Sequence, residues 1–351
     1  MAGFKAQSLA AICCLALVGL SQPRGARADQ SEPAGSIRQI TEGQACRGCT
    51  IERSLVVTLR DDSVLGSITK LSTVHVTSNG TYIIGTSDAG VPFLANRQGY
   101  VVRPIGRRGQ GPGEYRGPLL SYETRDSYFI ADQLQRRWTK LSKDFEYQGS
   151  SRIAVESGIR APLSDGSYVT SGRNTSRSGV GHPLHVTSAD GESVYSFGGD
   201  HIPVPENVEP RPLRLTIAAD TVLWVAHPDH YRLEKWTTKG KRVAVYERQN
   251  PWLPTVKPHI ADLGAFRITD IRLDASGRLW VHLTAFGSRN TIIEVIDTSR
   301  SSVLATTIIK DWIAPPARLM PGFGTGYLVY YYREASSGEP LIDVFAFELR
   351  R

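Results

Sequence analysis

A turn followed by an aromatic residue that opens an apolar strand recurs six times in this chain of 351 residues, and no other feature restricts the fold as strongly. The aromatic residues are Tyr82, Tyr128, Tyr168, Trp224, Trp280 and Tyr327. Their positions place successive copies 46, 40, 56, 56 and 47 residues apart. Such intervals are typical of one four-stranded propeller blade with loop insertions, so we predict six structural repeats.

The rest of each repeat predicts strands as well. In the first five copies a second polar turn follows the aromatic residue, and Gly, Asn and Asp in these turns supply the positive φ of tight hairpins. The segments between turns are rich in β-branched residues, as in Ile292-Ile293-Glu294-Val295. No long segment has the 3.6-residue period of a helix. The sequence therefore predicts an all-β fold, a six-bladed β-propeller.

The sixth repeat stops early, because the chain ends at Arg351 before its second turn. The apolar stretch 54–59 precedes the first repeat and has no partner there. We expect it to supply the outer strand of the last blade and to close the ring, since an open ring leaves two unpaired strand edges. Residues 46–351 would then be a single six-bladed β-propeller. A β-sandwich with aromatic residues at chance spacing is the alternative.

Residues 1–28 have the pattern of a signal peptide. Lys5 precedes an apolar run of 12 residues, 9–20, and Ala26-Arg27-Ala28 is a cleavage pattern that would leave Asp29 as the new terminus. The run is shorter than the roughly 20 residues of a membrane span. Anchoring through a lipid on Cys13 is an alternative. We expect an exported periplasmic or extracellular protein without a transmembrane segment after cleavage, with residues 29–45 as an N-terminal linker.

Cleavage would also reduce the charge. Residues 1–28 contain three basic residues and no acidic one, so the formal net charge of +7 would fall to +4. No basic cluster is longer than a pair such as Arg107-Arg108 or Arg136-Arg137, which is far from a nucleic-acid-binding stripe. We expect a mildly basic, solvated surface, a monomer, and no nucleic-acid partner.

Cys46 and Cys49 are the cysteines that would remain after cleavage, in the order Cys46-Arg47-Gly48-Cys49. In an oxidising compartment so close a pair is most simply a local disulfide. Thr50 follows in place of the His of a haem-attachment motif, and no βαβ pattern surrounds the pair. A zinc site would need a second pair of ligands nearby.

The glycine-rich stretch 105–115, Ile-Gly-Arg-Arg-Gly-Gln-Gly-Pro-Gly-Glu-Tyr, lacks the Gly-Lys-Ser/Thr of a phosphate-binding loop, and Pro112 would stop a helix. Glycines here are expected to let the chain turn between blades, with Glu114 and the arginines pairing locally. Together with Tyr128-Phe129-Ile130-Ala131-Asp132, the stretch resembles exported bacterial six-bladed propellers related to the NHL-repeat and TolB-like groups. The resemblance implies fold and export and does not imply a reaction.

Basic residues recur just before the turn and aromatic residue in five of the six repeats, where the innermost strand of a blade is expected. They are His75, Arg160, Arg214, Arg267 and Arg318. If these side chains face the central channel, its mouth is electropositive and favours carboxylate or phosphate ligands. The alternative is that they face loops or pair with acids on neighbouring blades.

Residues for catalysis are not grouped in any recognisable set. His227 and His230 form a close pair of histidines, which is a weak signal in a loop, and no Gly-x-Ser-x-Gly motif is present. We predict no metal and no cofactor, and expect a binding protein of the cell envelope whose partner is a protein or a small anionic ligand. A metal-dependent hydrolase or lyase working at the central channel is the alternative.

Overall fold

The described elements of the chain are all strands. The computed structural model describes residues 37–42, 46–61, 68–69, 73–86, 88–153, 159–163, 165–172, 182–189, 191–198, 213–218, 221–228, 230–249, 266–285, 290–310, 319–321 and 327–351. The strands are β1 (Ile37–Gln39), β2 (Thr41–Glu42), β3 (Thr50–Leu59), β4 (Thr73–Val76), β5 (Tyr82–Gly85), β6 (Phe93–Ala95), β7 (Val101–Pro104), β8 (Arg107–Arg108), β9 (Glu114–Tyr115), β10 (Pro118–Glu123), β11 (Tyr128–Asp132), β12 (Arg137–Leu141), β13 (Tyr147–Arg152), β14 (Ile159–Pro162), β15 (Tyr168–Ser171), β16 (Leu184–Thr187), β17 (Ser193–Phe197), β18 (Arg214–Ala218), β19 (Val222–Ala226), β20 (Arg232–Thr237), β21 (Arg242–Glu247), β22 (Phe266–Leu273), β23 (Arg278–Ala285), β24 (Thr291–Asp297), β25 (Ser302–Ile309), β26 (Leu319–Pro321), β27 (Tyr327–Glu334) and β28 (Pro340–Arg350).

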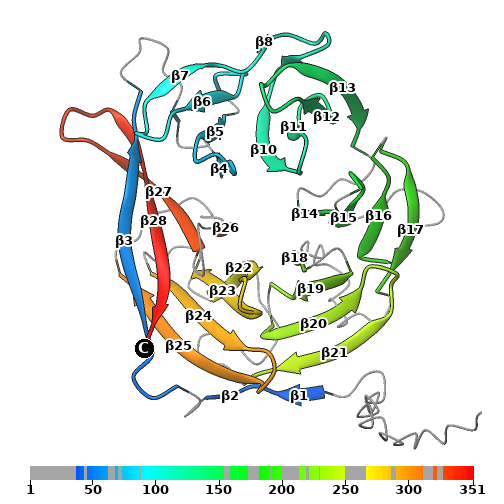
Figure 1. Ribbon diagram of the computed structural model, residues 1–351, viewed down its shortest axis with the longest axis vertical. Helices are drawn as coiled ribbons and strands as arrows, with labels where there is room; N and C mark the ends of the chain where they lie inside the picture. Colours follow the sequence, from blue (N-terminus) through cyan, green and yellow to red (C-terminus); the bar gives the residue numbers. More distant parts are fainter. Residues whose placement is uncertain are drawn as a thin grey trace, which may run out of the picture. The chain divides into compact units, whose positions relative to one another are not determined.

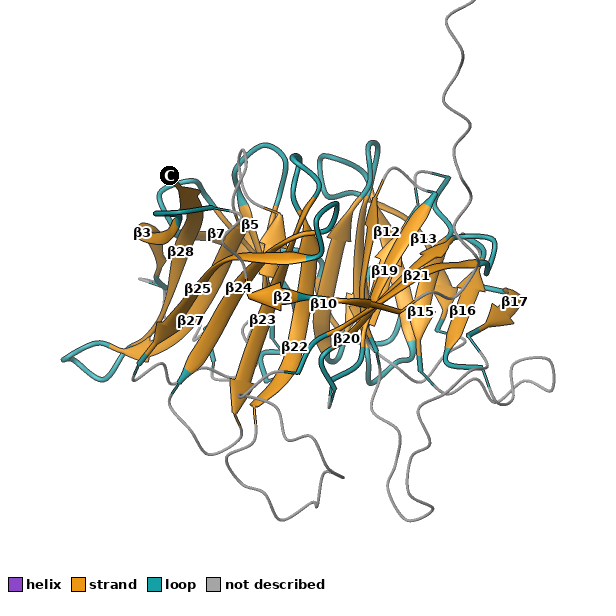
Figure 2. Cartoon of the chain, turned by 90° about the horizontal axis from the view of Figure 1, so that it is seen from below, coloured by secondary structure: helices purple, strands orange, loops and turns teal. Residues whose placement is uncertain are grey.

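These strands form six sheets of four or five strands each and one small sheet of two strands. Four of the larger sheets have the orders β4-β5-β6-β7, β10-β11-β12-β13, β14-β15-β16-β17 and β26-β27-β28-β3. The other two are β18 to β21, extended by β1, and β22 to β25, extended by β2. The sheets lie side by side around a centre within the unit Ala34–Arg351, and β4, β10, β14, β18, β22 and β26 face that centre (Figure 1). Seen from the side, the strands of successive sheets stand next to one another (Figure 2).

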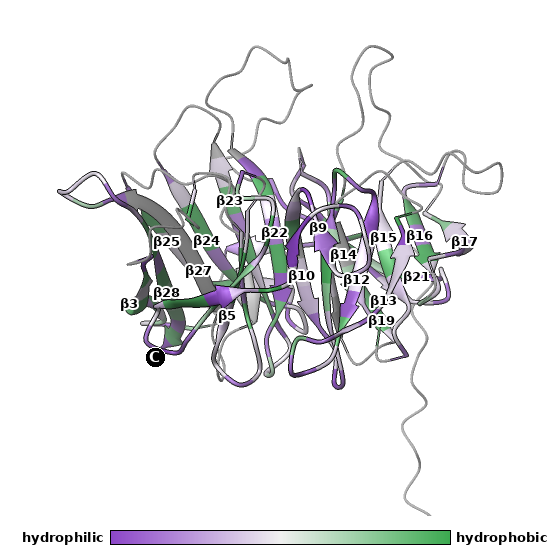
Figure 3. Cartoon of the chain, turned by 90° about the horizontal axis from the view of Figure 1, so that it is seen from above, coloured by the Kyte–Doolittle hydropathy of each residue, from purple (hydrophilic) through white to green (hydrophobic). Residues whose placement is uncertain are grey.

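Six clusters of buried apolar side chains hold neighbouring sheets together, and each cluster draws on two sheets. Between the sheet of β3 and the sheet of β4, for example, Leu59 and Val344 pack with Val74 and Ile84. Alternate residues of one strand serve opposite neighbours, because successive side chains of a strand point to opposite faces. In β5, accordingly, Ile84 packs toward the sheet of β3 while Ile83 packs toward the sheet of β10. The hydropathy colouring shows green apolar positions along these strands (Figure 3).

Five of the six recurring aromatic residues are buried in these clusters, namely Tyr82, Tyr128, Tyr168, Trp224 and Trp280. Each lies on the second strand of its sheet, and Tyr327 begins β27, the second strand of the last sheet. The repeat seen in the sequence therefore marks one packing position that recurs around the structure.

The N-terminal belt, which we define as residues 37–42 and 46–59, lies along three successive sheets. β1 pairs in parallel with β21, β2 pairs in parallel with β25, and β3 pairs antiparallel with β28 (Figure 1). Residues 37–42 were expected in a linker, so this part of the linker prediction differs from the structure. The reason is that β1 and β2 are short and mostly polar, and they add to existing edges through backbone hydrogen bonds that leave no apolar period in the sequence. β3 begins at Thr50, four residues before the predicted strand.

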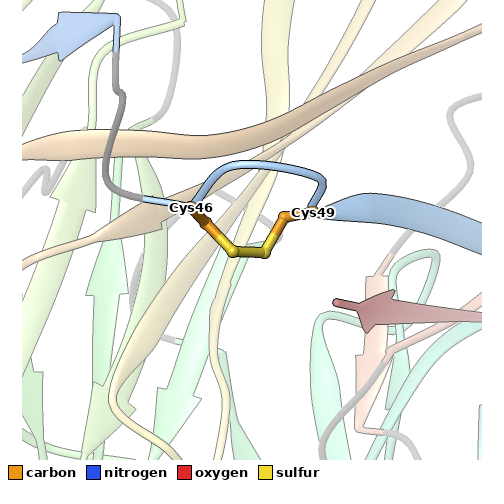
Figure 4. Close-up of a disulfide and its surroundings, with 2 residues drawn as sticks. All are labelled: Cys46 and Cys49. Carbon is orange, nitrogen blue, oxygen red and sulfur yellow. A yellow bond between two sulfur atoms is a disulfide. The ribbon is translucent and has the colours of Figure 1, made fainter.

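A disulfide joins Cys46 to Cys49 in the turn between β2 and β3 (Figure 4). The backbone N–H of Cys49 also donates to the carbonyl of Cys46. The bridge therefore closes a local loop in the belt at the point where it passes from one sheet to the next.

The glycine-rich stretch 105–115, hereafter the clip, connects the outer strand β7 to the inner strand β10. Glu114 accepts hydrogen bonds from the Gly111 N–H and from Arg107 Nε, both at 2.7 Å. Those bonds lower the pKa of the half-buried Glu114 carboxyl. Gly106 has φ +77°, and a Cβ there would lie 2.4 Å from the Gly113 carbonyl oxygen. The clip is thus a structural turn between sheets, as expected, and it ends with Tyr115 buried between them.

Asp132, at the end of β11, fixes the point where the clip enters β10. Its buried carboxylate accepts hydrogen bonds from the backbone N–H groups of Arg116, Gly117 and Gln135, at 2.6, 3.2 and 3.0 Å. The two blocks that carry the family resemblance, 105–115 and 128–132, therefore meet in the structure and share one structural role.

Candidate functional site

Four of the five predicted site residues lie in the described part of the chain, and all four are on the first strand of their sheet. His75 is on β4, Arg160 on β14, Arg214 on β18 and Arg267 on β22. Contacts join β4 to β10, β14 to β18, β18 to β22, β22 to β26 and β26 to β4, so these strands are the inner strands of the arrangement. Arg318 lies outside the described residues.

Arg214 and Arg267 are brought together by the packing of β18 against β22. Arg214 Nε donates to the carbonyl of Ile268, the residue next to Arg267, at 3.4 Å. Both arginine side chains are half-buried. Arg214 and Arg267 therefore lie on adjacent inner strands of neighbouring sheets.

His75 does not join this pair of arginines. In the register of the sheets His75 is opposite Ile83, one residue from the turn that ends β4, whereas Arg214 is opposite Ala226 at the other end of its sheet. His75 Nε2 instead lies 3.9 Å from Glu123 Oε2 on the neighbouring sheet, beyond hydrogen-bond range. Arg160, opposite Thr170, lies farther from its turn than His75 does.

Glu123 makes the surroundings of His75 acidic. Its carboxylate accepts hydrogen bonds from the Ser78 N–H at 2.6 Å, from the Ser78 hydroxyl at 2.5 Å and from Lys143. Burial opposes ionisation, but His75, Lys143 and Ser78 together outweigh it and lower the pKa of Glu123 to about 2. His75 is therefore part of a contact between sheets, and the expectation that it helps to attract an anion loses its support.

His282, which the sequence analysis did not single out, lies near Arg214. It is on β23, its exposed fraction is 0%, and its Nδ1 is 2.7 Å from the Thr269 hydroxyl oxygen. Its buried Nε2 has no hydrogen-bond partner among the described residues. Burial, with a smaller contribution from the charge of Arg214, lowers the pKa of His282 to about 3. The ring is therefore neutral at neutral pH.

A β-bulge in β22 places Thr269 against the ring of His282. The register between β22 and β23 shifts between Ile268 and Asp270, so Thr269 is the extra residue. A bulge re-aims the side chain of its extra residue, here toward the ring of His282. No turn or spacing signal in the sequence indicates the bulge, although His282 does follow the recurring Trp280 by two residues.

Acidic charge close to the arginines is largely offset. Asp270 is buried, and its Oδ2 lies 3.6 Å from Nη2 of Arg272 on the same strand. The described inner strands β18 and β22 carry Arg214, Arg267 and Arg272 against the single carboxylate of Asp270. The net charge of this part of the inner surface is positive.

Within the described residues, no group of three or more His, Cys, Asp or Glu side chains is placed to hold a metal ion. A search of the same residues finds no helix long and apolar enough to cross a membrane.

Comparisons with known proteins agree with this arrangement of sheets. An exported protein of Bacteroides fragilis superimposes with a TM-score of 0.62 at 12% identity, covering 90% of this chain and all of the other. The chain is an all-β propeller. A member of the DUF4221 family from Bacteroides vulgatus superimposes with a TM-score of 0.60 at 9% identity, covering 86% of this chain and 99% of the other. At such identities the likeness establishes the fold alone. No family model and no curated protein sequence matches the chain.

The buried His282 predicts a stability that falls as the pH falls. In the unfolded chain His282 takes up a proton near pH 6.5, whereas in the propeller its pKa is about 3, so below pH 6.5 the unfolded state binds more protons. We expect a loss of about 2 kcal/mol in the free energy of unfolding between pH 7.5 and pH 5, measured by urea denaturation. His185, whose pKa burial also lowers, adds to the slope. His282→Gln should flatten most of this slope, and an unchanged slope would contradict the assignment.

Proposed function

We propose that this propeller is an exported binding protein of the cell envelope that holds a small anion near its centre through Arg214 and Arg267. The single observation that supports the proposal is the approach of Arg214 Nε on β18 to the Ile268 carbonyl on β22, the residue that follows Arg267 on the adjacent inner strand. Guanidinium groups bind carboxylates and phosphates through paired charge-assisted hydrogen bonds.

His282 lies behind the proposed site, because its side chain is fully buried and cannot meet a ligand directly. Its pKa is about 3, so the ring adds no charge at neutral pH. The Thr269 hydroxyl, 2.7 Å from Nδ1, holds the ring in place. The ligand contacts of the proposed site therefore rest on the two arginines.

The proposal extends to the number of blades and to the closure of the ring. We infer a six-bladed ring of the NHL-repeat and TolB-like type, in which each of the six larger sheets is a blade and β3 closes the ring through β28. The nine-residue register between β28 and β3, from Ile342–Leu59 to Arg350–Thr50, supports it. The apolar cluster that packs Leu59 and Val344 against Val74 supports it too.

Export rests on the N-terminal sequence. The signal-peptide pattern of residues 1–28 lies outside the described residues, as does the expected new terminus at Asp29. The exported relative of B. fragilis has the same fold, which is compatible with the proposal. Whether the destination is the periplasm or the exterior, expression in a bacterial host should yield a mature protein whose mass corresponds to residues 29–351.

The anion site predicts a loss of binding in two variants. A thermal-shift screen with phosphate, citrate and other small anions would first identify a stabilising anion, whose Kd is then measured by isothermal titration calorimetry. Arg214→Gln and Arg267→Gln should each weaken binding at least tenfold, because a charge-assisted hydrogen bond contributes about 1.5–3 kcal/mol. Arg300→Gln is the matched control. Arg300 is in the turn between β24 and β25, in the same sheet as Arg267, and 68% of its side chain is exposed. Unchanged affinity in both site variants would refute the site.

A further inference from the structure

Two of the basic pairs of the sequence, Arg107-Arg108 and Arg136-Arg137, come together around the clip. Arg137 is at the start of β12, and its guanidinium donates to the carbonyls of Gln110 at 3.0 Å and Gly111 at 2.7 Å. Arg107 and Arg108 form β8 within the clip itself. Residues almost 30 positions apart in the sequence thus contribute to one surface.

This surface is strongly cationic. Residues 103–116 and 132–137, hereafter the basic patch, contain six arginines and two carboxylates, which gives a net charge of +4. The arginines are Arg103, Arg107, Arg108, Arg116, Arg136 and Arg137. The value equals the formal charge expected for the whole chain after removal of residues 1–28, so the remaining residues are close to neutral together.

Both carboxylates in the basic patch already accept hydrogen bonds within the protein. Asp132 is buried and accepts three backbone N–H groups, and Glu114 accepts bonds from Gly111 and Arg107. Arg107 nevertheless keeps 80% of its side chain exposed, and Arg103, Arg108, Arg116 and Arg136 are exposed as well. The positive charge therefore faces solvent, where it acts over about a Debye length, roughly 10 Å in 0.1 M salt.

An exposed apolar side chain lies within the basic patch, next to Gly117, the residue after Arg116. Leu134 is 65% exposed, in the turn between β11 and β12. Arg136, two residues later, has φ +50°, a left-handed conformation that residues other than glycine adopt rarely. The turn is held there by bonds from the Gln135 N–H to Asp132 and from the Ile153 N–H to the Arg136 carbonyl. Leu134 is thus fixed in an exposed position beside arginines.

We propose that the basic patch docks the propeller on a bilayer surface rich in anionic head groups, with Leu134 entering the head-group region. Each arginine near an anionic surface contributes about 1 kcal/mol, and a small apolar insertion adds to the attraction. A soluble polyanion would be bound by the charges alone and would gain nothing from Leu134. The combination of guanidinium groups around an exposed leucine therefore favours a membrane surface.

The test uses the full mature chain in a vesicle sedimentation assay. We expect binding to vesicles of phosphatidylcholine with 30% phosphatidylglycerol at 50 mM salt, and at least tenfold weaker binding to pure phosphatidylcholine. Arg108→Gln/Arg116→Gln should lower the partition coefficient about 25-fold, roughly fivefold for each arginine. Leu134→Ser should weaken binding to anionic vesicles and leave binding to soluble polyphosphate unchanged.

Arg300→Gln/Arg350→Gln removes the same charge from two other sheets and is the matched control, because both side chains are exposed and lie outside the basic patch. This control should bind vesicles within about twofold of the wild type, since its arginines lie away from the docking surface. Equal losses in the control and the patch variants would mean that net charge alone drives binding. That result, absence of any preference for anionic vesicles, or insensitivity to Leu134→Ser would overturn the proposal.

Discussion

A mature chain that lacks residues 46–60 is expected to lose its cooperative unfolding transition. The deletion removes β3, whose residues pair with β28 from Ile342 to Arg350. It also removes the fully buried Leu59 from the cluster that joins the sheet of β28 to the sheet of β4. An open apolar face would remain beside a newly exposed edge at β28, and an uncovered apolar face of this kind destabilises a sheet in water.

The matched comparison is a chain that lacks residues 37–45 and keeps β3. β1 and β2 are fifth strands on sheets that already have four, so their loss should lower the midpoint and leave one sharp transition. Urea unfolding followed by both circular dichroism and tryptophan fluorescence distinguishes the two cases. If the chain without residues 46–60 melts as sharply and at as high a midpoint as the intact mature chain, β3 does not close the ring.

The repeat could be predicted from the sequence because it follows from burial. A side chain that packs between two sheets must be large and apolar wherever it recurs, and Tyr82, Tyr128, Tyr168, Trp224 and Trp280 all meet that condition. The clip could be interpreted for a similar reason, since its glycines and Glu114 have local roles. Features that depend on local chemistry are visible in one sequence.

Features that depend on where strands meet could not be predicted. Nothing in the sequence shows that β1 and β2 add to outer edges, because parallel edge pairing uses backbone groups that every residue has. The β-bulge that turns the Thr269 side chain toward His282 cannot be predicted either, because it too depends on how the backbones of two strands pair. The sequence places His75 on an inner strand, as it does the arginines. It does not show that His75 lies near the turn at one end of its strand while Arg214 lies at the opposite end of its own strand.

The largest single-residue effect is expected at Arg248, which connects the belt to the buried side of β24. Its guanidinium donates at 2.7 Å both to Glu294, whose side chain is 0% exposed, and to Glu42 of β2, whose side chain is 76% exposed. Tyr231 donates its hydroxyl to the other oxygen of Glu294 at 2.5 Å. Burial lowers the pKa of Arg248, but the Glu294 carboxylate outweighs it and the net direction is upward.

The two carboxylates on this one arginine should differ sharply in their contribution. Arg248→Met leaves the Glu294 charge buried without its cation, and we expect a loss of about 3–5 kcal/mol in the free energy of unfolding. Glu42→Gln removes an exposed partner and should cost at most about 1 kcal/mol. Because the uncompensated charge is the cause, Arg248→Met/Glu294→Gln should recover at least half of the loss. Urea midpoints of the four proteins decide it: similar small losses in Arg248→Met and Glu42→Gln, or no recovery in the double variant, would show that packing rather than charge holds this junction.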